Sequence, residues 1–272
     1  MKKPIRLGII GCGAIGRQVA LYVDKNLSRK IKVSYLYDSN PHHSNLLKLS
    51  LKNSSARTVP LPDILIENSD LVLEAASFRA VKPLLEKAIQ SEKDVIILSV
   101  GGLIGIEPLL KKAQRKGITI FIPSGAICGI DGVLASFQGK IKSCLLTTSK
   151  PPQGLKNVEY LKRKKIDLDT IKKETIVFQG SAGEAFRRFP QNINVASTLL
   201  LASRFKGLKV CIKADPHLKT NMHEIALESK MGRIQIKVQN LPSKENPKTS
   251  TLAVASTQAL LKKICSNIKI GT

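Results

Sequence analysis

The segment Ile5-Arg6-Leu7-Gly8-Ile9-Ile10-Gly11-Cys12-Gly13-Ala14-Ile15-Gly16 is an apolar run that ends in a glycine-rich turn. Its last six residues follow the pattern GxGxxG, and a helical pattern begins at Ile15. In that setting the first glycine allows a tight turn, the second lets a pyrophosphate approach the backbone, and the third lets the helix pack closely on the strand. The amino terminus of the helix adds N–H groups and a positive dipole that attract phosphate. The residues predicted to contact a dinucleotide here are Gly11, Cys12, Gly13, Ala14, Ile15 and Gly16.

An acidic residue stands where the ribose of such a dinucleotide would be recognised. Asp38 follows a second apolar run, residues 33–37, and lies 22 residues after Gly16. A carboxylate there binds the ribose 2′-hydroxyl and repels the 2′-phosphate of NADP, so it favours NAD. NADP stays open, because His42, His43 and nearby lysines add positive charge. The histidine pair is interpreted as exposed loop residues, and no metal site is predicted.

Apolar runs and helical patterns alternate through the first 122 residues. Further apolar runs fall at residues 71–75, 95–98 and 118–122, and amphipathic stretches between the runs fall at residues 44–51, 81–90 and 108–116. Strands that are apolar on both faces and separated by helices form a parallel sheet covered on both sides. We therefore predict an α/β, Rossmann-type doubly wound domain over residues 1–122. Because a cofactor lies across the carboxyl ends of such strands, Ala75 and Ala76 are predicted to border it.

After Pro123 the pattern changes to more alternation and fewer helices. The predicted strands are residues 140–149, 175–178, 209–214, 223–229 and 233–239, and the predicted helices are residues 131–137, 182–189 and 193–203. These predict a second, α+β domain over residues 123–250 with a mainly antiparallel sheet. Its polar, basic stretch 151–173 is interpreted as an excursion. The last amphipathic stretch, 251–264, predicts a helix with Ser250 as its N-cap, and residues 251–272 are expected to complete the first domain.

The charge of the chain is strongly positive. Its 272 residues include 44 Lys+Arg and 20 Asp+Glu, a formal net charge of +24. The excess is spread over both halves, Trp is absent and aromatic residues make up only 4%, so the stacking partners of a nucleic-acid binder are scarce. We interpret most of the charge as a lysine-rich solvated surface, part of which steers anionic ligands.

Cysteine usage and hydropathy bear on location. The five cysteines are scattered, without a CxxC pair, which favours a reducing cytosol and predicts a cytoplasmic protein. No apolar run approaches the roughly 18–20 residues needed to span a bilayer.

Three segments of the second half carry polar groups that could act on a substrate. Asn192 and Asn194 flank a predicted helix start, where amides often serve as caps. His223 enters a predicted strand, and a lone histidine is more often structural than catalytic. The segment ending in Lys248, Thr249 and Ser250 leads into the last helix, whose amino terminus could receive a substrate carboxylate.

Together these segments resemble the L-aspartate dehydrogenase family. The matching stretches are GIIGCGAIG (8–16), SGAICGIDGV (124–133), RFPQNINVASTLLLA (188–202), ADPHLKTNMHEI (214–225) and NLPSKENPKTS (240–250). The resemblance covers nearly the whole chain and keeps the order of the motifs. It departs at Cys128, where the family pattern has glycine, and across residues 151–173.

The resemblance implies an NAD(P)-dependent oxidoreductase that oxidises L-aspartate to iminosuccinate, which hydrolyses to oxaloacetate and ammonia, or that runs the reverse amination. It also implies a link to NAD biosynthesis and a homodimer formed through the sheet of the second domain. Carried over by position, His223 takes the catalytic role, while Ala126 and Asn192 contact the cofactor. We further assign Asn194, Lys248, Thr249 and Ser250 to the substrate.

Two alternatives stay open. One is another Rossmann amino-acid or imine reductase, although the His-His and Pro-Ser-Gly-Thr signature of dihydrodipicolinate reductases and the Glu-Lys-Pro of sugar oxidoreductases are absent. The other is a dinucleotide-sensing regulator that binds DNA through its basic surface, which would show steeply salt-dependent DNA binding.

Overall fold

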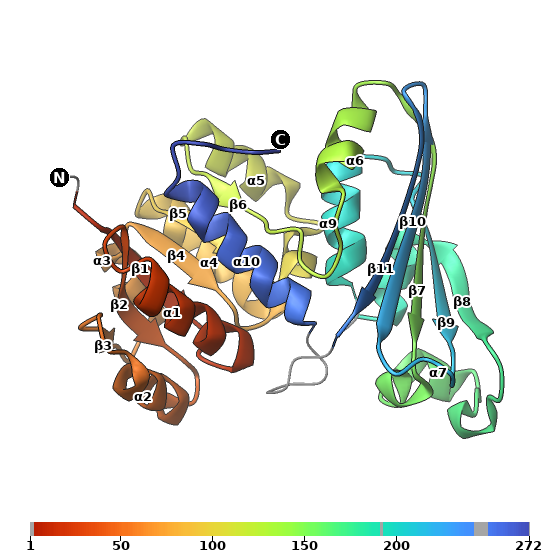
Figure 1. Ribbon diagram of the computed structural model, residues 1–272, viewed down its shortest axis with the longest axis horizontal. Helices are drawn as coiled ribbons and strands as arrows, with labels where there is room; N and C mark the ends of the chain where they lie inside the picture. Colours follow the sequence, from red (N-terminus) through yellow and green to blue (C-terminus); the bar gives the residue numbers. More distant parts are fainter. Residues whose placement is uncertain (1–2, 191–192, 242–249, 272) are drawn as a thin grey trace. The chain divides into compact units, whose positions relative to one another are not determined.

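The computed structural model describes residues 3–190, 193–241 and 250–271. The backbone divides into two compact units. Unit 1 comprises Met1–Pro123 with Val254–Ile270, and unit 2 comprises Ser124–Ala253 with Gly271–Thr272. Figure 1 labels the helices and strands of both units.

Unit 1 is built on six parallel strands in the order β3-β2-β1-β4-β5-β6. The strands are β1 (Ile5–Ile10), β2 (Ile31–Tyr37), β3 (Arg57–Thr58), β4 (Leu71–Glu74), β5 (Asp94–Ile97) and β6 (Ile120–Phe121). The helices are α1 (Ala14–Asn26), α2 (Pro41–Ser50), α3 (Pro62–Asn68), α4 (Phe78–Gln90), the 3-10 helix η1 (Val100–Leu103), α5 (Glu107–Arg115) and α10 (Thr251–Ile264). The strand order is that of a Rossmann fold, so the prediction of a doubly wound parallel sheet is confirmed.

The apolar strands explain why this unit needs helices on both faces. All four residues of β4 are buried, as are the last four of β1. Leu7 and Ile9 share an apolar core with Val19 of α1 and with Val254 and Leu261 of α10. The carboxyl ends of β1 and β4 lie side by side, because β1 pairs with β2 on one side and with β4 on the other. That is the point in the sheet where the strand order reverses and where such folds bind ligands.

Two short elements of unit 1 were not predicted. β3 has two residues, and α3 follows it after a few residues that begin with Val59. A two-residue edge strand is too short for its alternation to be recognised, and the seven residues of α3 give less than two full turns of helical periodicity.

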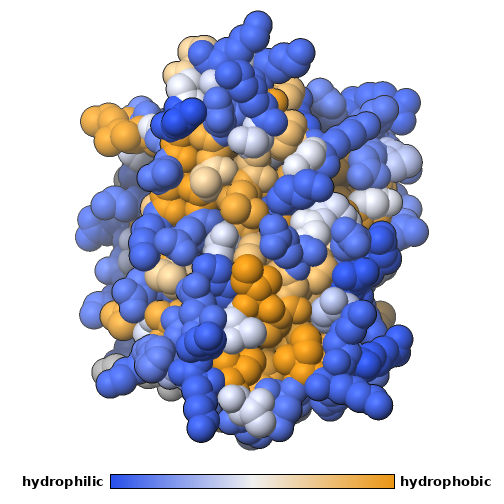
Figure 2. Space-filling model, turned by 90° about the vertical axis from the view of Figure 1, so that its right-hand side faces the viewer, coloured by the Kyte–Doolittle hydropathy of each residue, from blue (hydrophilic) through white to orange (hydrophobic). Residues whose placement is uncertain are grey.

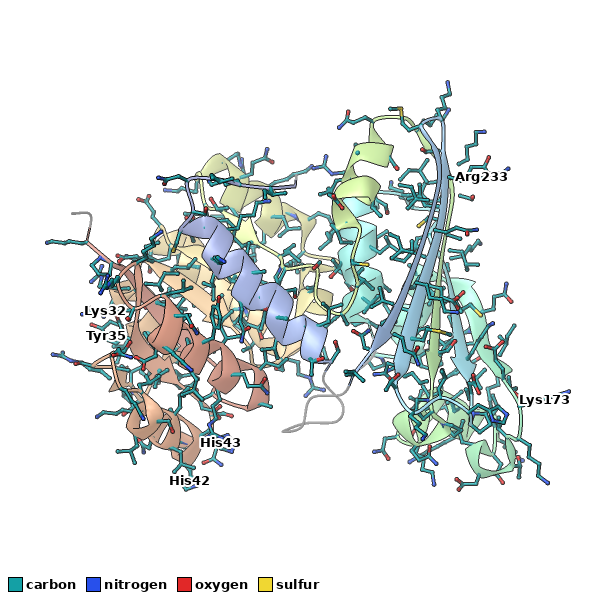
Figure 3. The ribbon with its side chains drawn as sticks, in the orientation of Figure 1. Lys32, Tyr35, His42, His43, Lys173 and Arg233 are labelled. Atoms are coloured by element: carbon teal, nitrogen blue, oxygen red, sulfur yellow. The ribbon has the colours of Figure 1, made fainter. Side chains whose placement is uncertain are left out.

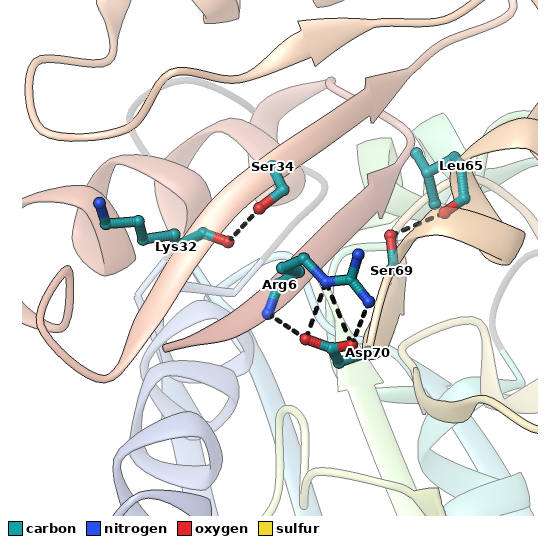
Figure 4. A network of polar contacts seen from close by, with 6 residues as sticks. All are labelled: Arg6, Lys32, Ser34, Leu65, Ser69 and Asp70. Carbon is teal, nitrogen blue, oxygen red and sulfur yellow. Dashed lines mark hydrogen bonds and ion pairs between the residues drawn. The ribbon is translucent and has the colours of Figure 1, made fainter. Parts of the chain in front are cut away.

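A polar network joins β1 to the residue before β4, at their amino ends (Figure 4). The Asp70 carboxylate accepts a hydrogen bond from the backbone N–H of Arg6 at 2.8 Å and one from its Nη2 at 2.6 Å. In the adjacent turn the Ser69 hydroxyl donates to the Leu65 carbonyl at 2.7 Å. Both charged side chains are about half exposed (52% and 42%), so the pair helps to set the register but adds little stability.

Unit 2 is built on five strands in the order β11-β10-β7-β9-β8. The strands are β7 (Ile141–Lys150), β8 (Thr175–Ser181), β9 (Lys209–Ala214), β10 (Asn221–Ser229) and β11 (Gly232–Asn240). The helices are α6 (Ile130–Phe137), the 3-10 helix η2 (Pro152–Leu155), α7 (Glu159–Arg163), the 3-10 helix η3 (Leu168–Thr170), α8 (Ala182–Arg188) and α9 (Asn194–Ser203). Only β7 and β9 pair in parallel, so the predicted mainly antiparallel sheet is confirmed.

The stretch 151–173 is anchored by apolar side chains, although its composition is basic. Leu155, Leu161 and Leu168 are buried and belong to the core of unit 2. The ring of Tyr160 packs against Phe178 and Phe189 in the same region. The lysines between these positions are exposed, so the stretch is a small folded excursion that turns its charge to solvent.

One face of the unit 2 sheet packs on α6 and α9, and Figure 2 views the other. Apolar side chains gather in the middle of that face, with polar and charged side chains around them. Among the described residues, none of the helices is long and apolar enough to cross a membrane.

Candidate functional site

The glycine loop of unit 1 has the geometry that its sequence predicts. Gly11 has φ +94°, and a Cβ at this position would lie 2.5 Å from the carbonyl oxygen of Ala75, so no larger residue fits. A Cβ on Gly16 would collide with the carbonyl of Gly11. A Cβ on Gly13 would meet nothing within 4 Å. The open space thus lies at the second glycine, where a pyrophosphate has to approach the backbone.

Helix α1 begins directly at that open space. Its N-cap is Gly13, which brings no side chain to cap the first turn. The N–H groups of a first helical turn have no partner within the helix, and they point toward an anion placed at its end. Ala14 and Ile15 begin this helix, and Cys12 lies in the turn before it. The loop therefore fits a dinucleotide pyrophosphate.

Asp38 lies at the carboxyl end of β2 and joins that end to the glycine loop. Its carboxylate accepts a hydrogen bond from Cys12 N at 2.7 Å and one from Asn40 N at 2.9 Å. His43 Nδ1 lies 3.4 Å away. The Cys12 thiol is buried. Burial, as the larger cause, and the charge of Asp38 raise the pKa of this thiol to about 12. Asp38 is thus held in place by backbone donors, as a ribose-binding carboxylate has to be.

The histidine pair corrects one detail of the sequence interpretation. His42 and His43 lie in the first turn of α2, not in a loop, because Asn40 caps that helix and Pro41 begins it. Both side chains are exposed, and Figure 3 shows them on the outer side of α2. Within the described ranges, no group of three or more His, Cys, Asp or Glu residues could hold a metal ion.

A cavity of about 480 Å³ connects the loop with Asp38. Gly11, Gly13, Ala75 and Ala76 line it at the carboxyl ends of β1 and β4. Ile66 and Leu84 form an apolar wall, and Asp38 with Asp63 forms an acidic edge. An apolar wall suits a flat base and a carboxylate suits a ribose hydroxyl, so the cavity has the chemistry of an adenosine site.

A buried carboxylate that sequence reasoning missed holds the backbone next to this cavity. Glu74 is fully buried at the end of β4 and accepts hydrogen bonds from Ala76 N and Ser99 N, both at 2.8 Å, and from Leu98 N at 3.2 Å. The Ser99 hydroxyl donates to it at 2.8 Å. Burial raises the pKa of Glu74, and these hydrogen bonds oppose the rise. The signal in the sequence was a lone acid ending the run Leu71-Val72-Leu73.

In unit 2, His223 lies on β10 directly opposite Thr148 of β7. Its side chain is buried, and its Nδ1 lies 3.0 Å from the Thr148 hydroxyl. Burial, followed by the charge of Lys150, lowers the pKa of His223 from 6.5 to about 4. The imidazole is therefore neutral near pH 7 and has one nitrogen able to accept a proton.

Lys150 is the second residue of this region that the sequence did not single out. It ends β7, two positions after Thr148, and is half-buried. Burial lowers the pKa of its ammonium group to about 8. The sequence showed it only as one lysine among many, and the register of β7 with β10 is what brings it near His223.

Ala126 and Ser250 are tied together through Asn240 at the end of β11. The Asn240 side chain donates from Nδ2 to the Ala126 carbonyl at 2.9 Å and accepts from the Ser250 hydroxyl at 2.8 Å. Ser250 Oγ also accepts from Ala253 N at 3.3 Å, so the predicted N-cap of the last helix is confirmed. The Ser250 hydroxyl is thus occupied by structural contacts.

The remaining predicted residues are placed as follows. Asn194 is the first residue of α9, and its N-cap position is occupied by Ile193, not by an asparagine. Cys128 is exposed beside Gly129, which has φ +67°. Asn192, Lys248 and Thr249 lie outside the described residues.

Two family models match this chain. Residues 131–264 match the model described as "Aspartate dehydrogenase, C-terminal", and residues 11–123 match the one described as "Homoserine dehydrogenase, NAD binding domain". The first match covers the half of the chain with the more specific motifs.

Similar proteins extend the match to the full length. L-aspartate dehydrogenase of Methanosarcina barkeri is 40% identical over an alignment of 274 positions, which covers 98% of this chain and 100% of that protein. L-aspartate dehydrogenase of Methanococcus maripaludis strain C6 is 39% identical over 271 residues, with 98% and 100% covered.

Solved structures agree with the fold. The crystal structure of aspartate dehydrogenase from Thermotoga maritima matches with a TM-score of 0.75 and 28% identity over 98% of this chain and 99% of that one. A homoserine dehydrogenase from Thiobacillus denitrificans matches with a TM-score of 0.62 at 14% identity, covering 97% and 73%, which shows the fold alone.

Proposed function

Because the chain belongs to the L-aspartate dehydrogenase family, we propose that it is an NAD-dependent oxidoreductase acting on the CH–NH2 group of L-aspartate. The products are iminosuccinate and, after hydrolysis, oxaloacetate and ammonia, and the reverse amination uses the same groups. The observation that carries this proposal is the similarity of residues 131–264 to aspartate dehydrogenases, because a Rossmann domain alone names no reaction.

Unit 1 is proposed as the cofactor domain. The loop from Gly11 to Gly16 holds the pyrophosphate, Asp38 binds the ribose, and Ala75 and Ala76 border the cofactor. NAD bound in this way supplies the acceptor for the hydride that leaves the substrate α-carbon. The acidic edge of the cavity formed by Asp38 and Asp63 favours NAD, because the extra phosphate of NADP would be repelled there. Ala126 and Asn192 are proposed as further cofactor contacts.

Unit 2 is proposed as the substrate and dimerisation domain, with His223 as the catalytic residue. Oxidation of the α-carbon requires the substrate amine to be neutral, and hydrolysis of the imine requires a water molecule to lose a proton. A neutral imidazole can accept either proton at Nε2. For that, Nδ1 has to carry the ring hydrogen and donate it to the Thr148 hydroxyl, which the contact of 3.0 Å allows.

Asn194, Lys248, Thr249 and Ser250 are proposed on the substrate side. Of these, Ser250 is proposed to position the backbone of the substrate side, because its hydroxyl is already bonded to Asn240. The location is proposed to be the cytoplasm, because all five cysteines are free. We also propose that iminosuccinate from this reaction enters NAD biosynthesis.

A homodimer is proposed on the sheet face of unit 2 that its own helices leave uncovered. A hollow of about 430 Å³ in this sheet is lined by Leu145, Thr147 and Ala226 among others. Apolar side chains gather on the same face in Figure 2. Light scattering after gel filtration should give twice the monomer mass for the wild type and the monomer mass for Ala226→Arg. A monomeric wild type would contradict the dimer.

The activity is tested by following NADH or NADPH at 340 nm with L-aspartate beside other L-amino acids. We expect formation of NADH with L-aspartate well above that with any other amino acid. A signal with another amino acid and none with L-aspartate would favour a different amino-acid dehydrogenase. No turnover together with steeply salt-dependent DNA binding would favour the regulator.

A further inference from the structure

Three polar side chains interrupt one end of an apolar sheet face in unit 2. Along β10, the buried Ile225 and Leu227 alternate with outward residues, and His223 continues the same series. Along β7, the buried Leu146 is followed by Thr148 and then Lys150 at intervals of two. Since side chains two apart on a strand point to the same side, His223, Thr148 and Lys150 share the core-facing side of the sheet.

The register fixes how close these groups are. His223 pairs with Thr148, and Lys150 is two positions further along the same strand. Lys150 is therefore a diagonal neighbour of His223 on one face, with backbone positions roughly 7–8 Å apart, a separation that long side chains cross easily. Burial lowers the pKa of His223, and the positive charge of Lys150 lowers it further, in agreement with this neighbouring position.

Two other lysines of this sheet lie on its opposite face. Lys213 of β9 is in register with Ser149, so it points to the opposite face, where its Nζ contacts Glu174 at 2.8 Å. Lys237 of β11 contacts Glu224 on that same face at 3.3 Å. These two lysines lie on the face opposite to His223, whereas Lys150 lies on the same face as the histidine proposed as the base.

Lys150 is also partly removed from water. It is half-buried at the end of β7, and a Cβ added at Gly154 of η2 would lie 3.8 Å from both the Cβ and the Cδ of Lys150. The segment after β9 approaches it as well, since Asp215 N donates to the Lys150 carbonyl at 2.9 Å. A desolvated ammonium group makes stronger contacts with an anionic ligand than one in bulk water does.

Resting on the proposed function, we propose that Lys150 is a substrate-binding residue that takes a carboxylate of the dicarboxylate substrate beside His223. Both carboxylates of L-aspartate have the chemistry to fill this position. The contact has a second consequence. A carboxylate against Lys150 cancels the positive charge that lowers the basicity of His223, so substrate binding strengthens the base that then accepts a proton.

The kinetic test compares three variants of the full-length enzyme. Lys150→Met removes the charge and keeps the stem, Lys150→Arg keeps the charge, and Lys173→Met removes an exposed lysine that points away from the chain in Figure 3. We expect Lys150→Met to raise the KM for L-aspartate roughly 10- to 100-fold, the usual value of a hydrogen bond to a charged group, while the KM for NAD stays within twofold. Lys150→Arg should recover part of the loss, and Lys173→Met should match the wild type. An unchanged KM for L-aspartate in a folded Lys150→Met enzyme would overturn the proposal.

L-Asparagine, as a competitive inhibitor, decides which carboxylate is bound, because it keeps only the α-carboxylate. If Lys150→Met weakens L-asparagine as much as L-aspartate, Lys150 holds the α-carboxylate. If inhibition by L-asparagine is unchanged, Lys150 holds the side-chain carboxylate. Either result supports the contact.

A second measurement needs no turnover and therefore separates this proposal from the proposed activity. The pKa of His223 is followed by NMR of its ring, with succinate as the probe. In the wild type succinate should raise that pKa. In Lys150→Met the pKa should already be higher without ligand and should not respond to succinate. A response of this kind in an enzyme inactive on L-aspartate would leave the carboxylate site in place and remove only the activity. A His223 pKa that ignores both succinate and the loss of Lys150 would contradict the proposal.

Discussion

The two candidate sites are built in opposite ways. The site in unit 1 is centred on backbone groups and small residues that are adjacent in the chain, from Gly11 to Gly16, and Asp38 contacts this loop from the end of β2. The site in unit 2 uses side chains, and its central contact joins Thr148 to His223 across 75 positions of sequence. A contiguous backbone motif can be recognised in a sequence, and it is shared by many enzymes. A side-chain pair assembled by strand register is hard to recognise, and it carries the particular chemistry.

This difference gives each site its own expected response to mutation. Changes in the backbone site should affect cofactor binding and selectivity. Changes in the side-chain site should affect turnover and the pH dependence of stability. If changes in the unit 1 site affected mainly turnover, and changes in the unit 2 site mainly cofactor binding, this contrast between the sites would be wrong.

The largest effect is expected for His223→Ala. Removal of a general base typically reduces a rate roughly 10²- to 10⁴-fold, so kcat should fall in that range, while the Kd for NAD should stay within twofold because the cofactor loop lies in the other unit. Steady-state kinetics and NAD titration by fluorescence check both values. Equal losses in NAD binding and turnover would show that His223 acts through the structure of the cofactor site.

The next largest effect is expected on the pH dependence of the free energy of unfolding. Burial holds the pKa of His223 at about 4, below its ordinary 6.5, so the folded state binds this proton less readily than the unfolded state does. The stability from this group is complete above pH 6.5 and is lost as the pH falls from 6.5 to 4, about 3 kcal/mol in all. Urea unfolding of wild type and His223→Gln at pH 7 and pH 4 should show a smaller pH dependence for the variant. Parallel pH dependences would mean that the pKa of His223 is the same in the folded and the unfolded protein.

A smaller effect is expected at Asp38. Asp38→Ala should narrow the preference for NAD over NADP by about tenfold, which corresponds to roughly 1.4 kcal/mol of lost repulsion. Asp38→Asn keeps an oxygen that can accept from Cys12 N, so it separates loss of charge from loss of the loop contact. Asp63→Ala removes the other carboxylate of the acidic edge, so it measures how much of the preference comes from α3. Kinetics with both cofactors decide, and a wild type that prefers NADP would contradict the assignment of Asp38.

The smallest effect is expected outside both sites. Arg6→Ala removes the guanidinium contacts to Asp70 but leaves the backbone N–H of residue 6 bonded to that carboxylate. Because the pair is about half exposed, the free energy of unfolding should change by less than about 1 kcal/mol, with no change in kcat or in the KM for NAD. Thermal unfolding and steady-state kinetics measure these quantities. A large loss of activity would show that the register of β1 with β4 is transmitted to the cofactor loop.

Much of the fold could be predicted because its signals are local. The parallel sheet is predicted by patterns of consecutive residues. These are the apolar runs at β1, β2, β4 and β5 and the GxGxxG turn between β1 and α1. The elements β3 and α3 were not predicted, because β3 has only two residues and α3 gives less than two full turns of helical periodicity. The basic stretch 151–173 escaped in part because its anchoring leucines are scattered among charged residues.

The candidate sites were predicted unevenly for the same reason. Gly11, Gly13, Asp38, Ala75 and Ala76 line one cavity, as a contiguous motif and strand ends imply. His223 was singled out only through resemblance, because a lone histidine in a strand has no local signature of catalysis. Lys150 and Glu74 were missed, since their meaning depends on burial and on partners from other strands.

The most direct test of the account follows the hydrogen on the α-carbon of L-aspartate. With L-aspartate deuterated at that carbon and NAD as cofactor, the enzyme should form NADH that carries one deuterium, as measured by mass spectrometry. The reduced cofactor should appear in proportion to oxaloacetate and ammonia. Unlabelled NADH, or deuterium released to water, would contradict hydride transfer from L-aspartate to NAD.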